Sequence, residues 1–241
     1  MNLIADIGNT RIKTAIFNHT TLVEKKIHST MHELMADTAF LAKAENVIIG
    51  TVVDSYKPFY DSLGSKKKII LFESSTPVPL KNLYESAATL GSDRLAASIG
   101  AFALYPNQNV LTIDAGTCIK YNFVNSDNEY IGGAISPGLA MRLRAMHQFT
   151  GRLPEITPDY NYEKLTGRST KESMLSGALL GAAAEIEECI NRYTRTHASL
   201  TVVVTGGDGP YLCKQLKNRI FAHPDIVLSG LNTILNYNIE K

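Results

Sequence analysis

The stretch that decides the fold occurs twice, as LIADIGNTRIKTAIFN at residues 3–18 and as LTIDAGTCIKYNFVN at residues 111–125. Each copy runs from an apolar segment through Asp-x-Gly and a threonine into Ile-Lys, and then into a second β-rich segment that ends in asparagine. The two aspartates, Asp6 and Asp114, are separated by nearly half the chain. The repeat therefore predicts two similar lobes, each beginning with a strand, a tight turn and a second strand.

The segments that follow each copy keep the same order. Each block continues with a third β-rich run, and helical patterns come after it. We expect an α/β protein with lobes at 1–107 and 108–241, each with three antiparallel strands at its start and helices after them. The expected strands are 2–6, 11–17, 22–28, 46–53, 68–73, 110–114, 119–124, 130–135 and 200–205, and the expected helices are 30–44, 92–105, 139 onward, 170–196, 211 onward and 229 onward.

Composition restricts the class of function. The chain has 241 residues, 44% of them hydrophobic, and a formal net charge of +1 from 24 basic and 23 acidic residues. The longest run of like charge is Lys66–Lys68, so the sequence shows no basic footprint for nucleic acid. Three widely spaced cysteines and the absence of a long apolar segment predict a soluble, cytoplasmic protein with reduced thiols and no membrane partner. Small-molecule chemistry is the favoured class.

The repeated turn has a chemical meaning if both copies face one ligand. Glycine after a strand, as at Gly8 and Gly116, lets backbone N–H groups approach phosphate oxygens without a Cβ in the way. Thr10 and Thr117 add hydroxyl donors to the two turns. The pattern predicts a phosphate-binding site built from both hairpins.

Charged residues flank these turns. Asp6 and Asp114 end their strands, where a carboxylate can hold Mg²⁺ directly or through water, and Lys13 can place a positive charge near a transferred phosphoryl group. A single Asp-x-Gly is more often an ordinary hairpin turn, and Lys13 and Lys120 taken alone would be solvent-side strand residues. Two copies at equivalent positions favour the ligand-binding interpretation. No G-x-x-x-x-G-K-[ST] is present in the sequence, which excludes a P-loop.

A third glycine-containing turn follows the strand expected at 200–205. Gly206 and Gly207 are compatible with a plain turn, but after two phosphate turns a close approach of backbone to adenine or ribose is the favoured interpretation.

DIGNT, DAGT and VTGG together resemble the phosphate-1, phosphate-2 and adenosine segments of the acetate and sugar kinase, Hsp70 and actin superfamily. Within it, LGSDRLAA at residues 90–97 resembles the G-x-D-R segment of type III pantothenate kinases, and residues 132–154 and 166–181 match that family in order and spacing. The resemblance implies two actin-like, ribonuclease H-like lobes, each with a mixed five-stranded sheet.

The resemblance also implies roles for individual residues. The residues implied to bind ATP are Asp6, Gly8, Asn9, Thr10, Lys13, Gly116, Thr117, Gly206 and Gly207, with Asp6 also holding Mg²⁺ through water. The residues implied to bind pantothenate are Tyr84, Gly91, Ser92, Asp93, Arg94 and Thr170. Asp114 matches the ligand of a monovalent cation, K⁺ or NH₄⁺. The family usually has a proline three residues after the tyrosine, where this chain has Ala87, so we expect a less rigid loop next to Tyr84.

Asp93 matches the general base of the family. A carboxylate in the first turn of a helix is stabilised by the helix dipole and can accept the proton of a hydroxyl group, while Arg94 can bind the carboxylate of the substrate. Without the resemblance, a capping role for Asp93 would be favoured.

The function implied is the ATP-dependent phosphorylation of pantothenate to 4'-phosphopantothenate, the first step of coenzyme A biosynthesis, by a homodimeric enzyme. Two alternatives stay open, because fold alone does not establish activity. One is a non-catalytic nucleotide-binding regulatory protein of the same fold, and the other is a kinase of another small hydroxy acid.

Overall fold

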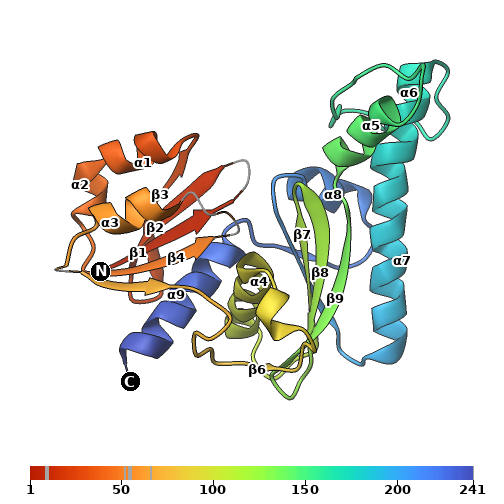
Figure 1. Ribbon diagram of the computed structural model, residues 1–241. Helices are drawn as coiled ribbons and strands as arrows, with labels where there is room; N and C mark the ends of the chain where they lie inside the picture. The colour runs from red at the N-terminus through yellow and green to blue at the C-terminus, as the bar shows by residue number, and fades with distance from the viewer. Residues whose placement is uncertain (9–10, 52, 54–55, 66, 241) are drawn as a thin grey trace. The chain divides into compact units, whose positions relative to one another are not determined.

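The computed structural model describes residues 1–8, 11–51, 53, 56–65 and 67–240 (Figure 1). The chain divides into two compact units: unit 1 comprises Met1–Asn107, Asp127–Ile131 and Asp225–Lys241, and unit 2 comprises Gln108–Ser126 and Gly132–Pro224. The expected lobe boundary between residues 107 and 108 stays a prediction. Two segments beyond residue 107, Asp127–Ile131 and Asp225–Lys241, belong to unit 1.

Unit 1 contains a five-stranded mixed sheet in the order β3-β2-β1-β4-β5. β1 runs antiparallel to β2 and parallel to β4, β2 is antiparallel to β3, and β4 is parallel to β5. This agrees with the strands expected in the first half of the chain. The strands are β1 (Asn2–Ile7), β2 (Ile12–Asn18), β3 (Thr21–His28), β4 (Asn46–Thr51) and β5 (Lys68–Leu71).

Three short helices cover one face of this sheet (Figure 1). They are α1 (Met31–Ala36), α2 (Thr38–Leu41) and α3 (Lys57–Ser62), and they bury Leu34, Phe40 and Phe59 against alternate residues of β1 and β2. The single helix expected at 30–44 is wrong, because Asp37 ends α1 and its carboxylate accepts a hydrogen bond from the Phe40 N–H to begin α2. A short polar side chain that competes for backbone groups breaks a helix in this way.

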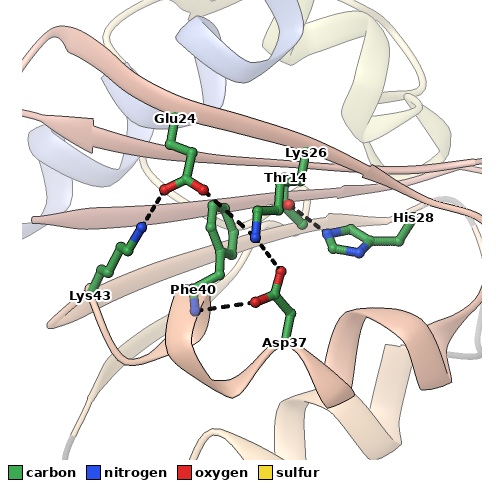
Figure 2. A network of polar contacts seen from close by, with 7 residues as sticks. All are labelled: Thr14, Glu24, Lys26, His28, Asp37, Phe40 and Lys43. Carbon is green, nitrogen blue, oxygen red and sulfur yellow. Dashed lines mark hydrogen bonds and ion pairs between the residues drawn. The ribbon is translucent and has the colours of Figure 1, made fainter.

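A polar network joins the edge strand β3 to α2 (Figure 2). Lys26 Nζ lies 2.5 Å from Asp37 Oδ2 and 3.6 Å from Glu24 Oε1. The same nitrogen lies 4.8 Å from the centre of the Phe40 ring. Glu24 also forms an ion pair with Lys43. The buried His28 ring shares a 2.9 Å hydrogen bond with the Thr14 hydroxyl. Charged side chains along an exposed edge strand also discourage pairing with another chain.

The opposite face of the sheet is covered by α9 (Ile226–Ile239), which contacts β1 and β4 and crosses α4 (Ser92–Leu104). The two helices meet at glycines: a Cβ built on Gly230 would lie 1.8 Å from the Ala96 carbonyl oxygen, and one on Gly100 would lie 2.2 Å from that of Ile226. Asn2 of β1 donates to Asn232 and Asn236 of α9, at 2.9 and 2.7 Å. The C-terminal helix is thus part of the core of unit 1.

The second sheet has six strands in the order β11-β10-β7-β8-β9-β6. The expectation of five strands is wrong by one, because β6 (Lys81–Asn82) pairs with the beginning of β9. β7 is antiparallel to β8 and parallel to β10. The other strands are β7 (Val110–Ala115), β8 (Cys118–Val124), β9 (Glu129–Pro137), β10 (Thr201–Thr205) and β11 (Phe221–Ala222).

Helices of unit 2 pack on the sheet face that carries Leu111, Ile113 and Ala115. The helix expected at 170–196 consists of α6 (Thr170–Leu175), a π-helical turn η3 (Ser176–Leu180) and α7 (Gly181–Thr196) in direct succession. The remaining helices are α5 (Leu139–Gln148) and α8 (Gly209–Gln215). Among the residues that the structure describes, no helix is both long and apolar enough to cross a membrane.

Candidate active site

The first repeated turn joins β1 to β2. Asp6 and Lys13 are direct cross-strand partners on the face opposite Ala5, and the Gly8 N–H donates to the Arg11 carbonyl at 3.2 Å to close the turn. Both charged side chains are half-buried. Two candidates in this turn, Asn9 and Thr10, lie outside the described residues.

The second turn, in unit 2, also has an aspartate opposite a lysine. Asp114 and Lys120 are direct partners on β7 and β8, and Lys120 Nζ lies 2.8 Å from Asp114 Oδ2 with both side chains largely shielded from solvent. The Gly116 N–H donates to the Cys118 carbonyl at 3.0 Å. Lys120 therefore occupies the position of Lys13 in the repeat. The repeat itself is the signal for this residue, because Lys120 taken alone has the pattern of an ordinary solvent-side strand lysine.

The third glycine turn lies beside the second. Thr205, the last residue of β10, pairs with Asp114, so the chain leaves both strands at the same edge of the sheet. Gly206 has φ +93°, and a Cβ there would lie 2.1 Å from the Ala115 carbonyl oxygen, so only glycine fits. The structure thus brings Gly116 and Gly206 together, as a shared nucleotide site requires.

The beginning of α5 completes this group. The Gly138 N–H donates to the Thr117 carbonyl at 3.1 Å, and a Cβ on Gly138 would lie 2.1 Å from the Gly116 carbonyl oxygen. Arg142, one turn along α5, donates to the Pro137 carbonyl at 2.8 Å and lies 2.5 Å from Glu185 Oε2 on α7. The helix start is therefore held against the second turn from both sides.

Asp208 is a functional candidate that the sequence interpretation did not identify. It directly follows Gly207, it is 9% exposed, and its Oδ1 accepts a 2.6 Å hydrogen bond from the Tyr160 hydroxyl. Burial raises the pKa of the Asp208 carboxyl, and hydrogen bonds from Tyr160 and from the Leu139 N–H oppose that shift. An aspartate after two glycines has the composition of an ordinary turn, so the sequence carried no signal for it.

The candidate acceptor-binding residues begin α4 in unit 1. The Ser92 hydroxyl donates to the Thr51 carbonyl at 2.9 Å, and Thr51 ends β4 beside the strand that carries Asp6. Asp93 is half-buried, and its Oδ1 accepts a 2.8 Å hydrogen bond from the Arg94 N–H. Unit 1 thus places the Asp6–Lys13 turn and the start of α4 at neighbouring strand ends.

Arg94 is buried, and Tyr84 orients it. The guanidinium Cζ lies 5.4 Å from the centre of the Tyr84 ring, and Nη1 lies 3.4 Å from the Tyr84 hydroxyl. The Tyr84 ring in turn packs on Tyr130 with centroids 6.0 Å apart. Ala87, where the family has proline, is the first residue of the 3₁₀ helix η2 (Ala87–Thr89).

A cavity of about 360 Å³ adjoins the start of α4, lined by residues that include Thr51, Asn82, Leu90, Gly91, Ser92 and Leu95. Thr170, the remaining candidate, is the exposed first residue of α6, the helix that Ser169 caps in unit 2. The residues expected to bind the acceptor are therefore divided between the two units.

Each unit by itself presents, at a strand end, groups that can bind part of a magnesium nucleotide. In unit 2, a Cβ built on Gly116 or Gly207 would meet no atom within 4 Å, so a ligand can approach the backbone there. In unit 1, a Cβ on Gly8 would lie 3.3 Å from the Arg11 carbonyl oxygen. Asp6 and Asp114 place a carboxylate at the end of β1 and of β7. In the described part of the chain, no three His, Cys, Asp or Glu side chains gather as a metal cage. Mg²⁺ is usually held by one or two carboxylates together with phosphates and water, and Asp6 is such a carboxylate at a strand end.

Comparison with known proteins identifies the family. Residues 2–192 match the family model described as type III pantothenate kinase. The chain belongs to the type III pantothenate kinase family. A type III pantothenate kinase of Bacteroides fragilis is 42% identical over 241 residues, 99% of this chain and 98% of the relative. Another, from Christiangramia forsetii, is 39% identical over 244 residues, 99% of each chain.

Solved structures of distant proteins share the fold of this family member. A conserved Campylobacter jejuni protein described as a Baf family transcriptional activator superposes with a TM-score of 0.65 at 20% identity, over 99% of this chain and all of that one. The activator of 2-hydroxyisocaproyl-CoA dehydratase from Clostridium difficile, with bound ADPNP, superposes with a TM-score of 0.54 at 11% identity, over 99% of this chain and 94% of that one. At these identities the likeness confirms the expected actin-like α/β fold class alone.

Proposed function

We propose that this chain transfers the γ-phosphoryl group of ATP to the primary hydroxyl of pantothenate, which gives 4'-phosphopantothenate for coenzyme A biosynthesis. The observation that carries the proposal is the match to type III pantothenate kinases over essentially the whole chain. The paired Asp–Lys turns, one in each unit, agree with a kinase site.

Binding of the nucleotide is assigned to the turns. The Asp6–Lys13 turn and the Gly116–Thr117 turn supply backbone donors for the phosphates, and Gly206 and Gly207 lie against the adenosine end. Asp6 holds Mg²⁺ through water, and the bound ion supplies charge neutralisation between the phosphates. Lys13, as the direct partner of Asp6, places its ammonium group on the same face of the sheet.

Activation of the acceptor is assigned to the start of α4. Asp93 accepts the proton of the pantothenate hydroxyl, and its hydrogen bond from the Arg94 N–H fixes the direction of the carboxylate. The buried Arg94 guanidinium, held over the Tyr84 ring, binds the carboxylate of pantothenate. Gly91, Ser92 and Thr170 complete the contacts to this substrate.

The finer parts of the proposal concern the ion, the assembly and the compartment. Asp114 binds K⁺ or NH₄⁺ through its carboxylate, in competition with the Lys120 ammonium group 2.8 Å away. The enzyme is a homodimer, and it works in the cytoplasm. The three cysteines, Cys118, Cys189 and Cys213, are all free thiols, the state that a reducing compartment maintains.

The test is an ADP-release assay with MgATP and a panel of small hydroxy acids that includes pantothenate. Turnover with pantothenate supports the proposal, and turnover with a different acid alone points to a kinase of that acid. Nucleotide binding without turnover of any acceptor points to the regulatory alternative.

Asp93→Asn tests the general base. The substitution keeps the helix start and the volume but removes the proton acceptor, so kcat should fall by roughly 10²- to 10⁴-fold while ADP binding is unchanged. Asp37→Asn is the matched control, because Asp37 is a helix cap outside the turns and should keep kcat. Asparagine also caps helices well, so kcat of Asp93→Asn within about threefold of wild type would assign Asp93 a capping role and reject it as the base.

A further inference from the structure

Asp208 connects three segments of unit 2 that end at the same edge of the sheet. Its backbone N–H donates to the Ala115 carbonyl at 3.0 Å, which fixes the glycine turn against the end of β7. Its carboxylate accepts from the Tyr160 hydroxyl at 2.6 Å and from the Leu139 N–H, the first residue of α5. One buried side chain thus bonds to the start of a helix and to the 151–169 loop.

The Leu139 bond has a physical reason. α5 begins after Gly138, which has no side chain to accept from the first N–H groups of the helix. A carboxylate from another element satisfies one of these donors and lies at the positive end of the helix dipole. Asp208 therefore caps α5 from outside it. In turn α5 abuts the second phosphate turn, since the Gly138 N–H donates to the Thr117 carbonyl.

The Tyr160 bond holds the carboxylate from the other side. The Tyr160 ring is half-exposed and packs at 5.7 Å on the ring of Tyr211, which belongs to α8. α8 begins directly after Asp208, so the loop and the helix together enclose the carboxylate. These contacts leave Asp208 little freedom to turn toward solvent.

We propose that Asp208 is a positioning residue for the nucleotide, because it fixes the spacing between the Gly206–Gly207 turn and the Gly116–Thr117 turn through the first N–H of α5. The inference rests on the proposed function insofar as these two turns contact the nucleotide. Asp208 acts through the two turns, and its effect falls on the affinity for nucleotide.

Substitutions of Asp208 should therefore weaken binding of ATP in the ground state and the transition state alike. Asp208→Ala raises KM for ATP and Kd for ADP by roughly tenfold, because a charge-assisted bond between the segments is lost, while kcat stays within about threefold. KM for pantothenate stays unchanged. Asp208→Asn keeps one acceptor oxygen and recovers part of the affinity, and Tyr160→Phe removes one donor and has the smallest effect.

The experiment titrates ADP into the full chain by calorimetry and measures KM and kcat for the same variants. Asp37→Ala is the matched control, since it removes a carboxylate that caps α2 in unit 1 and should lower the melting temperature without changing Kd for ADP. If Asp208→Ala does not fold, Asp208→Asn and Tyr160→Phe decide the question.

Unchanged Kd for ADP in the folded Asp208 variants, or a fall in kcat at constant KM for ATP, would overturn the inference and leave the proposed function intact. A wild-type chain that binds ADP but does not phosphorylate pantothenate would overturn the proposed function, and the ADP titrations would still decide the role of Asp208. A wild-type chain that binds no ADP would overturn both.

Discussion

The contact between α4 and α9 allows a prediction whose sign depends on the structure. Gly230 lies so close to α4 that a Cβ would be 1.8 Å from the Ala96 carbonyl oxygen and 2.9 Å from the Gly100 nitrogen. Both are backbone atoms of a buried helix, so no side chain can rotate away. Gly230→Ala must force the helices apart, and α4 carries Asp93 and Arg94 in its first turn.

Two effects of this substitution oppose each other. Alanine in place of glycine inside a helix gains about 1 kcal/mol. Overpacking a well-packed contact costs about 1–3 kcal/mol, and a clash with backbone belongs at the upper end of that range. We therefore expect a net loss of about 2 kcal/mol in the free energy of unfolding, which corresponds to a melting temperature about 4–8 °C lower in a chain of this size. Because α4 shifts, kcat should fall as well.

Denaturant unfolding at 25 °C, with the melting temperature and kcat measured on the same preparation, tests this. Ser229→Ala, on the preceding residue of α9, is the control: it adds no volume and should stay within about 0.5 kcal/mol of wild type. A Gly230→Ala variant as stable as wild type, or stabilised by the helix-propensity gain, would refute the close crossing.

Three further predictions concern pH, the monovalent ion and the assembly. Burial lowers the pKa of His28 below its ordinary value of 6.5, against the opposing charges of Glu33 and Asp37. The unfolded chain therefore binds the proton more readily, and the free energy of unfolding falls as pH drops below about 6.5. His28→Gln should make the free energy of unfolding less dependent on pH between about pH 7 and 5, and an unchanged slope would contradict this. Activity in sodium buffer should rise when K⁺ or NH₄⁺ is added, and Asp114→Asn should lose this response. Lys120→Met should lower the K⁺ concentration that gives half-activation, because the competing ammonium group is gone. Equal rates in sodium and potassium would contradict a monovalent-cation site at Asp114. Sedimentation of the active enzyme at assay concentration should show a dimer, and an active monomer would contradict the proposed assembly.

The parts of the fold that the sequence predicted are those with a local pattern. The three strands of each block show apolar or alternating runs, and the Asp-x-Gly turns fixed where those runs pair. Helix α4 was predicted by Ser92 at its start and Pro106 after its end. Each of these signals spans only a few residues, so it can be recognised without knowledge of the rest of the chain.

The parts that escaped prediction depend on distant residues or on very short segments. β6 and β11 have two residues each, too few to show a period. The packing of α9 in unit 1 depends on bonds such as Asn2 to Asn232 and on the glycine contact with α4, which no local pattern reveals. The π-helical turn η3 could not be predicted either, because the small and apolar residues of 176–180 continue the helical pattern of the residues on both sides.

Some residues of the candidate site were also predictable from a local pattern, and others were not. The repeated motif predicted Asp6 and Asp114 at equivalent strand positions and Lys13 on the strand after the first turn, and the structure places each aspartate opposite a lysine. Asp208 was missed because its importance comes from partners at Leu139 and Tyr160, far away in sequence. The assignment of roles to all these residues stays a prediction.

The two turns are not equivalent, and the difference gives a reason for different roles. Both Asp–Lys pairs are direct cross-strand partners, yet the first turn is one residue longer: the Gly8 N–H reaches the carbonyl three residues on, and the Gly116 N–H reaches the carbonyl two residues on. The additional residue must therefore lie in the turn. By its sequence length alone, the first turn has one more backbone N–H group to offer an anion. The Lys120–Asp114 ion pair stands beside the shorter turn. The phosphates are accordingly expected to depend mainly on the first turn, and deletion of one residue between Gly8 and Arg11 should weaken ADP binding far more than insertion of one glycine after Thr117.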